Sequence, residues 1–340
     1  MISPRTVRNL RSEFRHSLMA KIGVVLLISI LLASIFAPFL ALHDPTHQYS
    51  GESNNPPIGF GGETETATTE VVDGEVQTTV ETVEQSPTME HPLGTDALGR
   101  DMFSRLLFGA RTSILVGLTA TTLAATAGVV YGLTAGYYGG RIDDGMMRLA
   151  DIMLAFPSLV LAVTLIGLYG TGSIRIPDPW VGLGLVDGMP ESFVFPGTIT
   201  VVIALVSWVW FARVARGEAL SLRDEDYVRA ARTAGASDWY LLRKHLLPNC
   251  LTPIIVLATV QVAVVILLES ALAFLGFSGT QLSWGFDVAQ GRDYLATSWW
   301  ITTLPGMAIL LTVVAINLIG DWFRDALDPD ISGEEGGTGA

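Results

Sequence analysis

Long apolar stretches without a charged residue alternate along the chain with shorter polar segments. Six of these stretches are 21 to 29 residues long, whereas a helix of roughly 20 residues is enough to cross a bilayer. They are Ile22–Leu42, Thr112–Gly140, Ile152–Ile174, Ser192–Ala212, Leu246–Leu268 and Tyr294–Gly320. The pattern predicts an all-α integral membrane protein with six transmembrane helices.

Composition supports this prediction and excludes other classes. Charged residues make up 16% of the 340 residues, against roughly 25% in soluble proteins, and the mean hydropathy is +0.46. Cys250 is the only cysteine, which excludes an internal disulfide and a thiolate metal cluster. The net charge of −13, with Lys21 and Lys244 as the only lysines, argues against nucleic acid as a partner.

The distribution of basic residues predicts the orientation in the membrane. Fifteen of the twenty Lys and Arg residues occur in residues 1–21, 141–151 and 213–245 and at Arg324. Cytoplasmic segments of membrane proteins carry this excess, so both termini are expected in the cytoplasm. The first apolar stretch exceeds a signal-peptide core and is expected to remain as a membrane anchor.

An acidic insertion is predicted on the outer side. Residues 48–90 contain no Lys or Arg and are rich in Gly, Pro, Thr and Glu, a composition that cannot bury a core. Within it, residues 68–72 and 75–79 flank Asp73-Gly74, a pattern typical of a β-hairpin. Two interpretations remain open: a solvated insertion, or a contact for an outer partner.

The sequence HPLGTDALGRD, residues 91–101, follows the insertion. Gly94 and Gly99 give the backbone freedom, and aspartate side chains can accept from neighbouring amides. We therefore expect a structured turn that docks on the outer ends of the helices. His91 with Asp96 alone is weak support for a metal site, so no metal ligands are predicted.

The loop of residues 217–249 on the cytoplasmic side has the signals of two short helices. Ser221 and Asp224 have capping-box spacing, and the first helix is expected to run to Ala234. Gly235 suits the left-handed position that follows a helix. Ser237 or Asp238 can cap the second helix, which Pro248 would end or bend.

The first of these helices has a face made of small residues. The face recurs at helical spacing and is formed by Tyr227, Ala230, Ala231 and Ala234. Alanines bury little apolar area but let the backbone of a partner come close. Arg229 and Arg232 flank the face, where partner carboxylates could pair with them. We therefore interpret it as a protein-binding face; the alternative is an amphipathic helix on the membrane surface.

These residues resemble the EAA loop of ABC importer permeases. The match consists of Arg229-Ala230-Ala231, then Gly235, then His245-Leu246-Leu247-Pro248. The segments 91–117, 136–162 and 317–329 are similar to the dipeptide/oligopeptide/nickel branch, specifically to its second, DppC/OppC-type permease subunit. The resemblance covers nearly the whole chain except roughly residues 48–90 and the last ten.

The resemblance implies a type I importer permease fold and a coupling helix that sits in a cleft of an ATP-binding subunit. The coupling residues it implies are Tyr227, Arg229, Ala230, Ala231, Ala234, Gly235, Leu247 and Pro248. Arg229 replaces the glutamate that opens the family motif, so no salt bridge of that glutamate is carried over. His245 replaces an apolar residue, a change that puts little in doubt.

The expected organisation has five parts. Residues 1–47 form the cytoplasmic N-terminus and first helix, 48–90 the insertion, 91–111 the outer turn, 112–324 the permease core and 325–340 an acidic cytoplasmic tail. The implied partners are a second homologous permease subunit, two ATP-binding subunits, an extracytoplasmic substrate-binding protein and the lipid bilayer, in the cell membrane.

The chain itself is not expected to be an enzyme. A P-loop needs a Gly-Lys-Ser/Thr sequence, but Lys21 follows Ala20 and Lys244 follows Arg243. HExxH and GxSxG motifs are also missing from the sequence. We therefore predict no catalytic residues and no bound cofactor, with ATP and Mg²⁺ used by separate ATPase subunits.

Glu269 is the one ionisable residue well inside a predicted span. An intramembrane charge is costly and is a functional candidate by default. Three roles remain open: lining of the translocation pathway, an interhelical hydrogen bond, or a place at the outer interface.

The resemblance leaves the substrate open among dipeptides, longer peptides, nickel and oligosaccharides, with peptides favoured. A different class, the ion-coupled secondary transporter, usually has several intramembrane carboxylates or an inverted repeat. Only one such carboxylate and no evident repeat occur here.

Overall fold

Helices make up most of the structure, a computed structural model that describes residues 13–72 and 75–327. The long helices are α2 (Leu18–Ile35), α4 (Met102–Tyr138), α5 (Gly140–Ala155), α6 (Ser158–Tyr169), α8 (Gly197–Leu222), α11 (Leu247–Phe274) and α13 (Trp300–Leu327). The shorter ones are α3 (Ala37–Leu40), α7 (Pro179–Gly182), α9 (Asp226–Thr233), α10 (Asp238–Leu241), α12 (Trp284–Gly291), the π-helical turn η1 (Leu242–Leu246) and the 3₁₀ turn η2 (Arg292–Tyr294).

The apolar stretches form membrane-spanning helices, with one correction. Within the described residues, five helices are long and apolar enough to cross a membrane, or six if the bent pair α5 and α6 counts as one span. That pair bends by 88°, so the predicted stretch Ile152–Ile174 is not a continuous helix. Pro157 explains the break: it forces Phe156 out of the helical region, to φ −91° and ψ 133°.

The fourth stretch begins differently from the prediction. Ser192–Phe195 forms strand β4, which pairs antiparallel with β3 (Ile174–Pro177). The helix α8 starts only after Pro196 and continues to Leu222, well beyond the apolar residues. The pattern of hydrophobic residues alone does not separate a buried strand from the start of a buried helix.

Helices α4 and α8 pack face to face through glycines. A Cβ added at Gly132 would overlap the carbonyl oxygen of Ala212, and one at Gly128 would overlap the carbonyl oxygen of Trp208. Small residues on one helix face allow this close backbone approach in membranes. This glycine face of α4 therefore lies against α8, and a large buried apolar cluster surrounds the contact.

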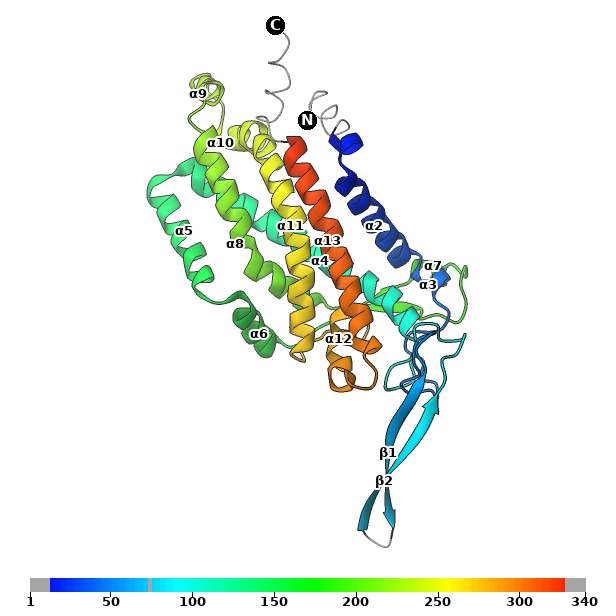
Figure 1. Cartoon of the computed structure of the whole chain (residues 1–340). Helices are drawn as coiled ribbons and strands as arrows, with labels where there is room; N and C mark the ends of the chain where they lie inside the picture. Colours follow the sequence, from blue (N-terminus) through cyan, green and yellow to red (C-terminus); the bar gives the residue numbers. More distant parts are fainter. Residues whose placement is uncertain (1–12, 73–74, 328–340) are drawn as a thin grey trace.

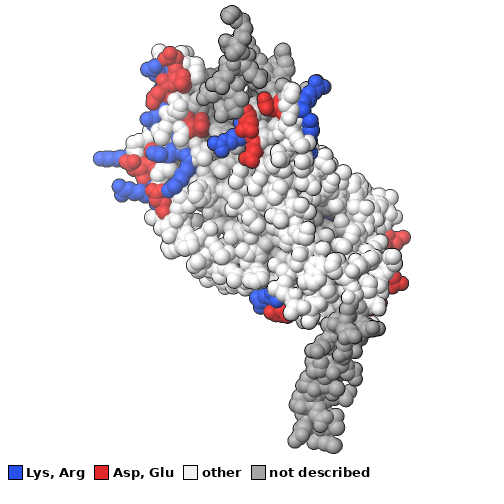
Figure 2. Space-filling view, in the orientation of Figure 1, with Lys and Arg blue, Asp and Glu red and all other residues white. Residues whose placement is uncertain are grey.

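The two ends of the bundle differ in shape and charge. Helix α9, the start of α2 and the end of α13 lie at one end, while the hairpin of β1 (Gly62–Val72) and β2 (Glu75–Gln85) extends from the other (Figure 1). Charged side chains gather around the α9 end, and the broad middle of the face in Figure 2 is uncharged. The start of α2, which contains Lys21, lies at this end (Figure 1), and Lys244 belongs to η1, which directly follows α10.

The predicted hairpin is confirmed and is longer than expected. Its strands pair antiparallel from Gly62↔Gln85 to Val72↔Glu75, beyond the residues 68–79 identified from sequence. The Asp73-Gly74 turn on which the prediction was based lies outside the described residues.

Candidate functional site

The loop of residues 217–249 forms the candidate site at the α9 end. Its first residues continue α8, so Ser221 lies inside that helix and the predicted capping box is wrong. Glu225 is the N-cap residue of α9, without a side-chain capping bond. The capping-box spacing was misleading because α8 continues ten residues past its apolar stretch. Ser221 therefore lies within a helix and not at the start of one.

The end of α9 is as predicted. Gly235 has a φ of +89°, and its N–H donates to the Arg232 carbonyl at 3.0 Å. The N–H of Ala236 donates to the Ala231 carbonyl at 3.1 Å. These two bonds form a Schellman motif, which satisfies carbonyls that the helix end leaves free. Glycine adopts this backbone conformation without the clash that a Cβ causes.

The small-residue face of α9 is largely open to solvent. Tyr227, Ala230 and Ala234 are exposed, whereas Ala231 is half-buried against the core. Val228 is fully buried and attaches α9 to the bundle. The sequence analysis missed this anchor, although Val228 is the one β-branched apolar residue within α9.

The two arginines of α9 make contacts within the chain. Arg229 donates to Asp226 Oδ1 at 2.6 Å. Arg232 lies over the ring of Tyr137, 5.3 Å from its centroid, and Tyr137 donates to Asp238 at 2.6 Å. Arg232 therefore ties α9 to α4, whereas Arg229 pairs within α9 itself.

The second predicted helix continues into a membrane span. Ser237 caps α10 by accepting from the N–H of Tyr240 at 3.4 Å, as expected. Pro248 neither ends nor sharply bends the helix, because the π turn η1 precedes it and lets α10 run on into α11. A wider turn relieves the clash between a proline ring and the carbonyl four residues earlier.

Helices α9 and α10 together present one exposed surface. Tyr227 contacts the ring of His245 at 5.8 Å between centroids and accepts from Asn249 at 3.3 Å. A groove of about 670 Å³ adjoins it, lined by Ser237, Trp239, Tyr240, Arg243, Lys244 and Pro248. We call these residues, with Tyr227, Arg229, Ala230, Ala234 and Gly235, the α9–α10 surface; Leu247 is half-buried beneath it.

Glu269 lies inside the helix packing. Its side chain is buried, and Ser113 of α4 donates to its Oε2 at 3.4 Å. The same hydroxyl oxygen accepts from the N–H of Trp284 at 3.4 Å. Of the three roles considered, this geometry favours an interhelical hydrogen bond.

Buried ion pairs fix the outer turn, which docks on helix ends as predicted. Arg105 contacts Asp287 of α12 and donates to the carbonyl of Pro45 at 3.0 Å. Asp96 accepts from Arg100 at 2.6 Å. Burial raises the pKa of Asp287, and the charge of Arg105 opposes that rise. Nothing in the local sequence marked Asp287 as the partner of Arg105.

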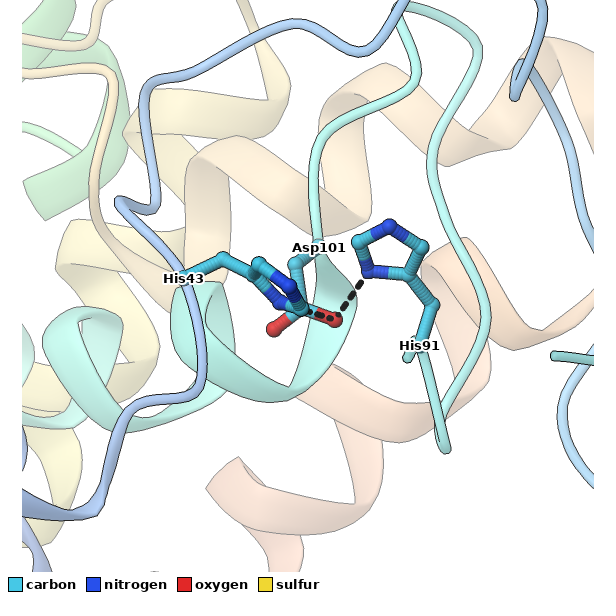
Figure 3. Close-up of side chains that lie close together, drawn as sticks. All are labelled: His43, His91 and Asp101. Atoms are coloured by element: carbon cyan, nitrogen blue, oxygen red, sulfur yellow. Dashed lines mark hydrogen bonds and ion pairs between the residues drawn. The ribbon is translucent and has the colours of Figure 1, made fainter. Parts of the chain in front are cut away.

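His91 pairs with a different aspartate from the one considered in the sequence. Its Nδ1 lies 2.9 Å from Asp101 Oδ1, while Asp96 binds Arg100. His43 also approaches Asp101, so that two imidazoles and a carboxylate meet at the start of α4 (Figure 3). This group has the residue types and spacing of metal ligands.

Two families match the sequence. Residues 128–333 match the family described as binding-protein-dependent transport system inner membrane component. Residues 7–57 match the family described as N-terminal TM domain of oligopeptide transport permease C.

Relatives align over nearly the whole chain. The di/tripeptide transport system permease protein DppC of Pseudomonas aeruginosa (strain UCBPP-PA14) is 35% identical, covering 97% of this chain and 94% of its own. The probable D,D-dipeptide transport system permease protein DdpC of Escherichia coli (strain K12) is 37% identical, covering 92% of this chain and 88% of its own. The oligopeptide transport system permease protein OppC of Bacillus subtilis (strain 168) is 32% identical, covering 94% of this chain and 88% of its own.

A solved structure shares the fold. An inward-facing structure of the MetNI methionine ABC transporter superposes with a TM-score of 0.51, covering 67% of this chain and 98% of that chain. The sequence identity is 16%, so this likeness concerns the arrangement of helices.

Proposed function

The chain belongs to the family of inner membrane components of binding-protein-dependent transport systems, and from that premise we propose that it forms half of the transmembrane pathway of a peptide importer. It is a non-catalytic, multi-pass membrane subunit of an ABC importer. Hydrolysis of ATP takes place on separate subunits.

Peptides are the proposed substrate class. The three relatives described above are named for the transport of di/tripeptides, D,D-dipeptides and oligopeptides. Nickel and oligosaccharides, which the resemblance left open, have no support from these three names. The proposed cargo is therefore a dipeptide or a longer peptide.

The exposed α9–α10 surface is the observation that carries the proposal of ATPase coupling. It pairs an open face of small residues with a groove bearing Trp239, whose side chain is 70% exposed. Aromatic and arginine side chains are enriched at protein interfaces, and the small residues beside them leave room for the backbone of a partner. We assign this surface to the cleft of an ATP-binding subunit.

The proposed complex contains a second homologous permease subunit, two ATP-binding subunits and an extracytoplasmic substrate-binding protein. ATP and Mg²⁺ belong to the ATP-binding subunits. The α9 end and both chain termini face the cytoplasm, where basic residues concentrate. The hairpin then faces outward, and a contact with an outer partner stays a prediction for it.

The geometry suggests how movement passes into the membrane. Helix α9 is fixed to the bundle by Val228 and by Arg232 on Tyr137. Helix α10 runs through η1 into α11 as one continuous helix. Closure of the ATPase subunits would therefore displace α9 and α11 together and shift the pore between two states.

The test is ATP hydrolysis by the complex, affinity-purified with its binding protein, with and without a peptide mixture. Hydrolysis stimulated by peptides supports both the coupling and the substrate class. Hydrolysis that ignores peptides but responds to nickel or oligosaccharides contradicts the proposed substrate. An intact preparation without any associated ATPase contradicts the assignment of the α9–α10 surface.

A further inference from the structure

Two histidines and an aspartate from separate segments meet at the outer end of the bundle. Figure 3 shows His43, from the segment after α3, and His91, from the turn before α4, on either side of Asp101. Asp101 Oδ1 lies 2.9 Å from His91 Nδ1 and 4.0 Å from His43 Nδ1. We propose that these three side chains bind a divalent transition-metal cation of the Zn²⁺ type.

The ligand atoms are close enough for one ion. All three lie within 4.8 Å of one another. Zinc binds imidazole nitrogen and carboxylate oxygen at about 2.0–2.2 Å, so ligand atoms around it are somewhat more than 3 Å apart. Binding would therefore need side-chain rotations that draw the ligand atoms together, with His43 moving toward Asp101 and His91 slightly away from it.

The carboxylate of Asp101 has one oxygen available for a cation. Its Oδ2 accepts from the backbone N–H of Ser104 at 2.7 Å, which caps α4 and holds the carboxylate in place. Its Oδ1 faces both imidazoles. Because Asp101 is fully buried, its charge is stabilised only by such short-range partners.

Neighbouring groups complete the pattern of a metal site. Glu52 Oε2 lies 2.9 Å from His91 Nε2, on the side of the ring away from Asp101. A metal on Nδ1 leaves the ring proton on Nε2, and Glu52 is close enough to accept it once the two groups align; metal-binding histidines almost always have such a partner.

Polar atoms of this group lack hydrogen bonds. His43 Nδ1 and His91 Nε2 are buried without a hydrogen-bond partner, since the contact between His91 and Glu52 has the distance but not the direction of one. Buried polar atoms normally have a partner. A cation bound by Asp101 and the two Nδ1 atoms would give His43 Nδ1 a partner. It would also fix the tautomer of His91, with the ring proton on Nε2.

The electrostatic surroundings favour a cation. Tyr49 packs against both imidazoles, with centroids 5.3 and 5.1 Å away. Four carboxylates lie around this tyrosine and give the region a negative potential: Asp101, Asp44, Glu52 and Glu90. The imidazole rings are 4.5 Å apart, close enough for both to approach the same cation.

The donor set indicates the class of metal. Two imidazole nitrogens with a carboxylate suit Zn²⁺ and similar transition metals, whereas Ca²⁺ and Mg²⁺ prefer oxygen ligands alone. Such an ion would join the segment that follows α3 to the turn before α4, close to where the hairpin leaves the bundle. The sequence analysis predicted no metal because only His91 lies within a recognisable motif.

The experiment measures Zn²⁺ binding by the full-length protein without a polyhistidine tag, purified in detergent. Equilibrium dialysis against Zn²⁺, followed by elemental analysis, gives the stoichiometry and affinity. We expect one tight site per chain, and affinity reduced by about tenfold or more in His43→Ala. His47→Ala is the matched control, because His47 is exposed and belongs to the same segment but not to the group.

A second readout separates binding from folding. Zn²⁺ should raise the unfolding temperature of the wild type and of His47→Ala, because a ligand of the folded state stabilises it, but not that of His43→Ala. His43 is only half-buried, so this variant should fold without metal. Wild-type protein without a stoichiometric site, or His43→Ala with wild-type affinity, would overturn the proposal.

Discussion

At the scale of single residues, two positions in the loop of residues 217–249 show why a substitution is tolerated or not. Gly235 has open space around it, yet its φ of +89° lies where a side chain is strained. Ala231 has an ordinary helical backbone, yet its half-buried side chain packs on the core. The two residues therefore limit substitution for different reasons.

Gly235→Ala should weaken the end of α9. A left-handed conformation costs an alanine about 1–2 kcal/mol, so the loop should open more often and peptide uptake should fall severalfold. Limited proteolysis of membranes and an uptake assay measure the two effects. The matched control is Gly217→Ala, an exposed helical glycine with open space; an equal loss in that variant would contradict the explanation.

Ala231→Glu and Ala230→Glu should differ in one respect. The first places a carboxylate against the core and should detach α9, while the second changes only the exposed face. Both should abolish most peptide uptake if the face contacts an ATPase. Only Ala231→Glu should make the loop sensitive to protease in membranes. Normal uptake by both variants would refute the assignment of the α9–α10 surface.

At the scale of elements, the contact between α4 and α8 organises the bundle. The backbones approach each other at Gly128 and Gly132, where no Cβ fits. Further bonds tie α8 to its neighbours, among them the pair of Arg216 with Asp143 at 2.5 Å. Precise packing of this kind replaces the hydrophobic effect, which is weak between helices in lipid.

Gly132→Leu should therefore separate α4 from α8. Overpacking costs about 1–3 kcal/mol in ordinary cores. The leucine side chain here would clash with the backbone of α8, which can move less than a side chain can. We expect a lower unfolding temperature and reduced accumulation in the membrane. Gly167→Leu in α6 provides the comparison, because Gly167 has open space; similar damage there would point to helix composition instead of packing.

The elements also show what sequence could predict. Long apolar stretches predicted the spans, and Gly235 and Ser237 predicted a helix end and a cap, because these signals act locally. The capping box at Ser221 failed because α8 extends past its apolar residues, whereas the break of the third span does have a local signal in Pro157. The approach of His43 to Asp101 and of Arg105 to Asp287 depends on the tertiary fold, which local pattern does not contain.

At the scale of the whole molecule, buried ion pairs connect distant parts of the chain. Arg105, at the start of α4, contacts Asp287 of α12, and Arg111 contacts Asp178 between α6 and α8. These pairs lie at the end of the bundle from which the hairpin leaves. The Arg105–Asp287 pair joins the first third of the chain to the last, and the Arg111–Asp178 pair joins the first third to the middle.

Arg105→Met should destabilise the protein strongly. It leaves Asp287 buried without its ion-pair partner, and breaking a buried pair costs about 3–5 kcal/mol. The double change Arg105→Met with Asp287→Leu should recover much of the lost stability, as measured by thermal unfolding in detergent. Arg292→Met removes an exposed ion pair and should cost under about 1 kcal/mol. A double variant as unstable as the single one would contradict this account.

The placement of the two lysines has a practical consequence. Lys21 and Lys244 both lie near the α9 end, and every other segment of the sequence is free of lysine. Amine-reactive dyes that cannot cross lipid will therefore label lysine side chains from one side of a sealed vesicle only. The extent of labelling in inside-out vesicles, compared with that in right-side-out vesicles, therefore shows which side of the membrane the two lysines face. No engineered tag is needed.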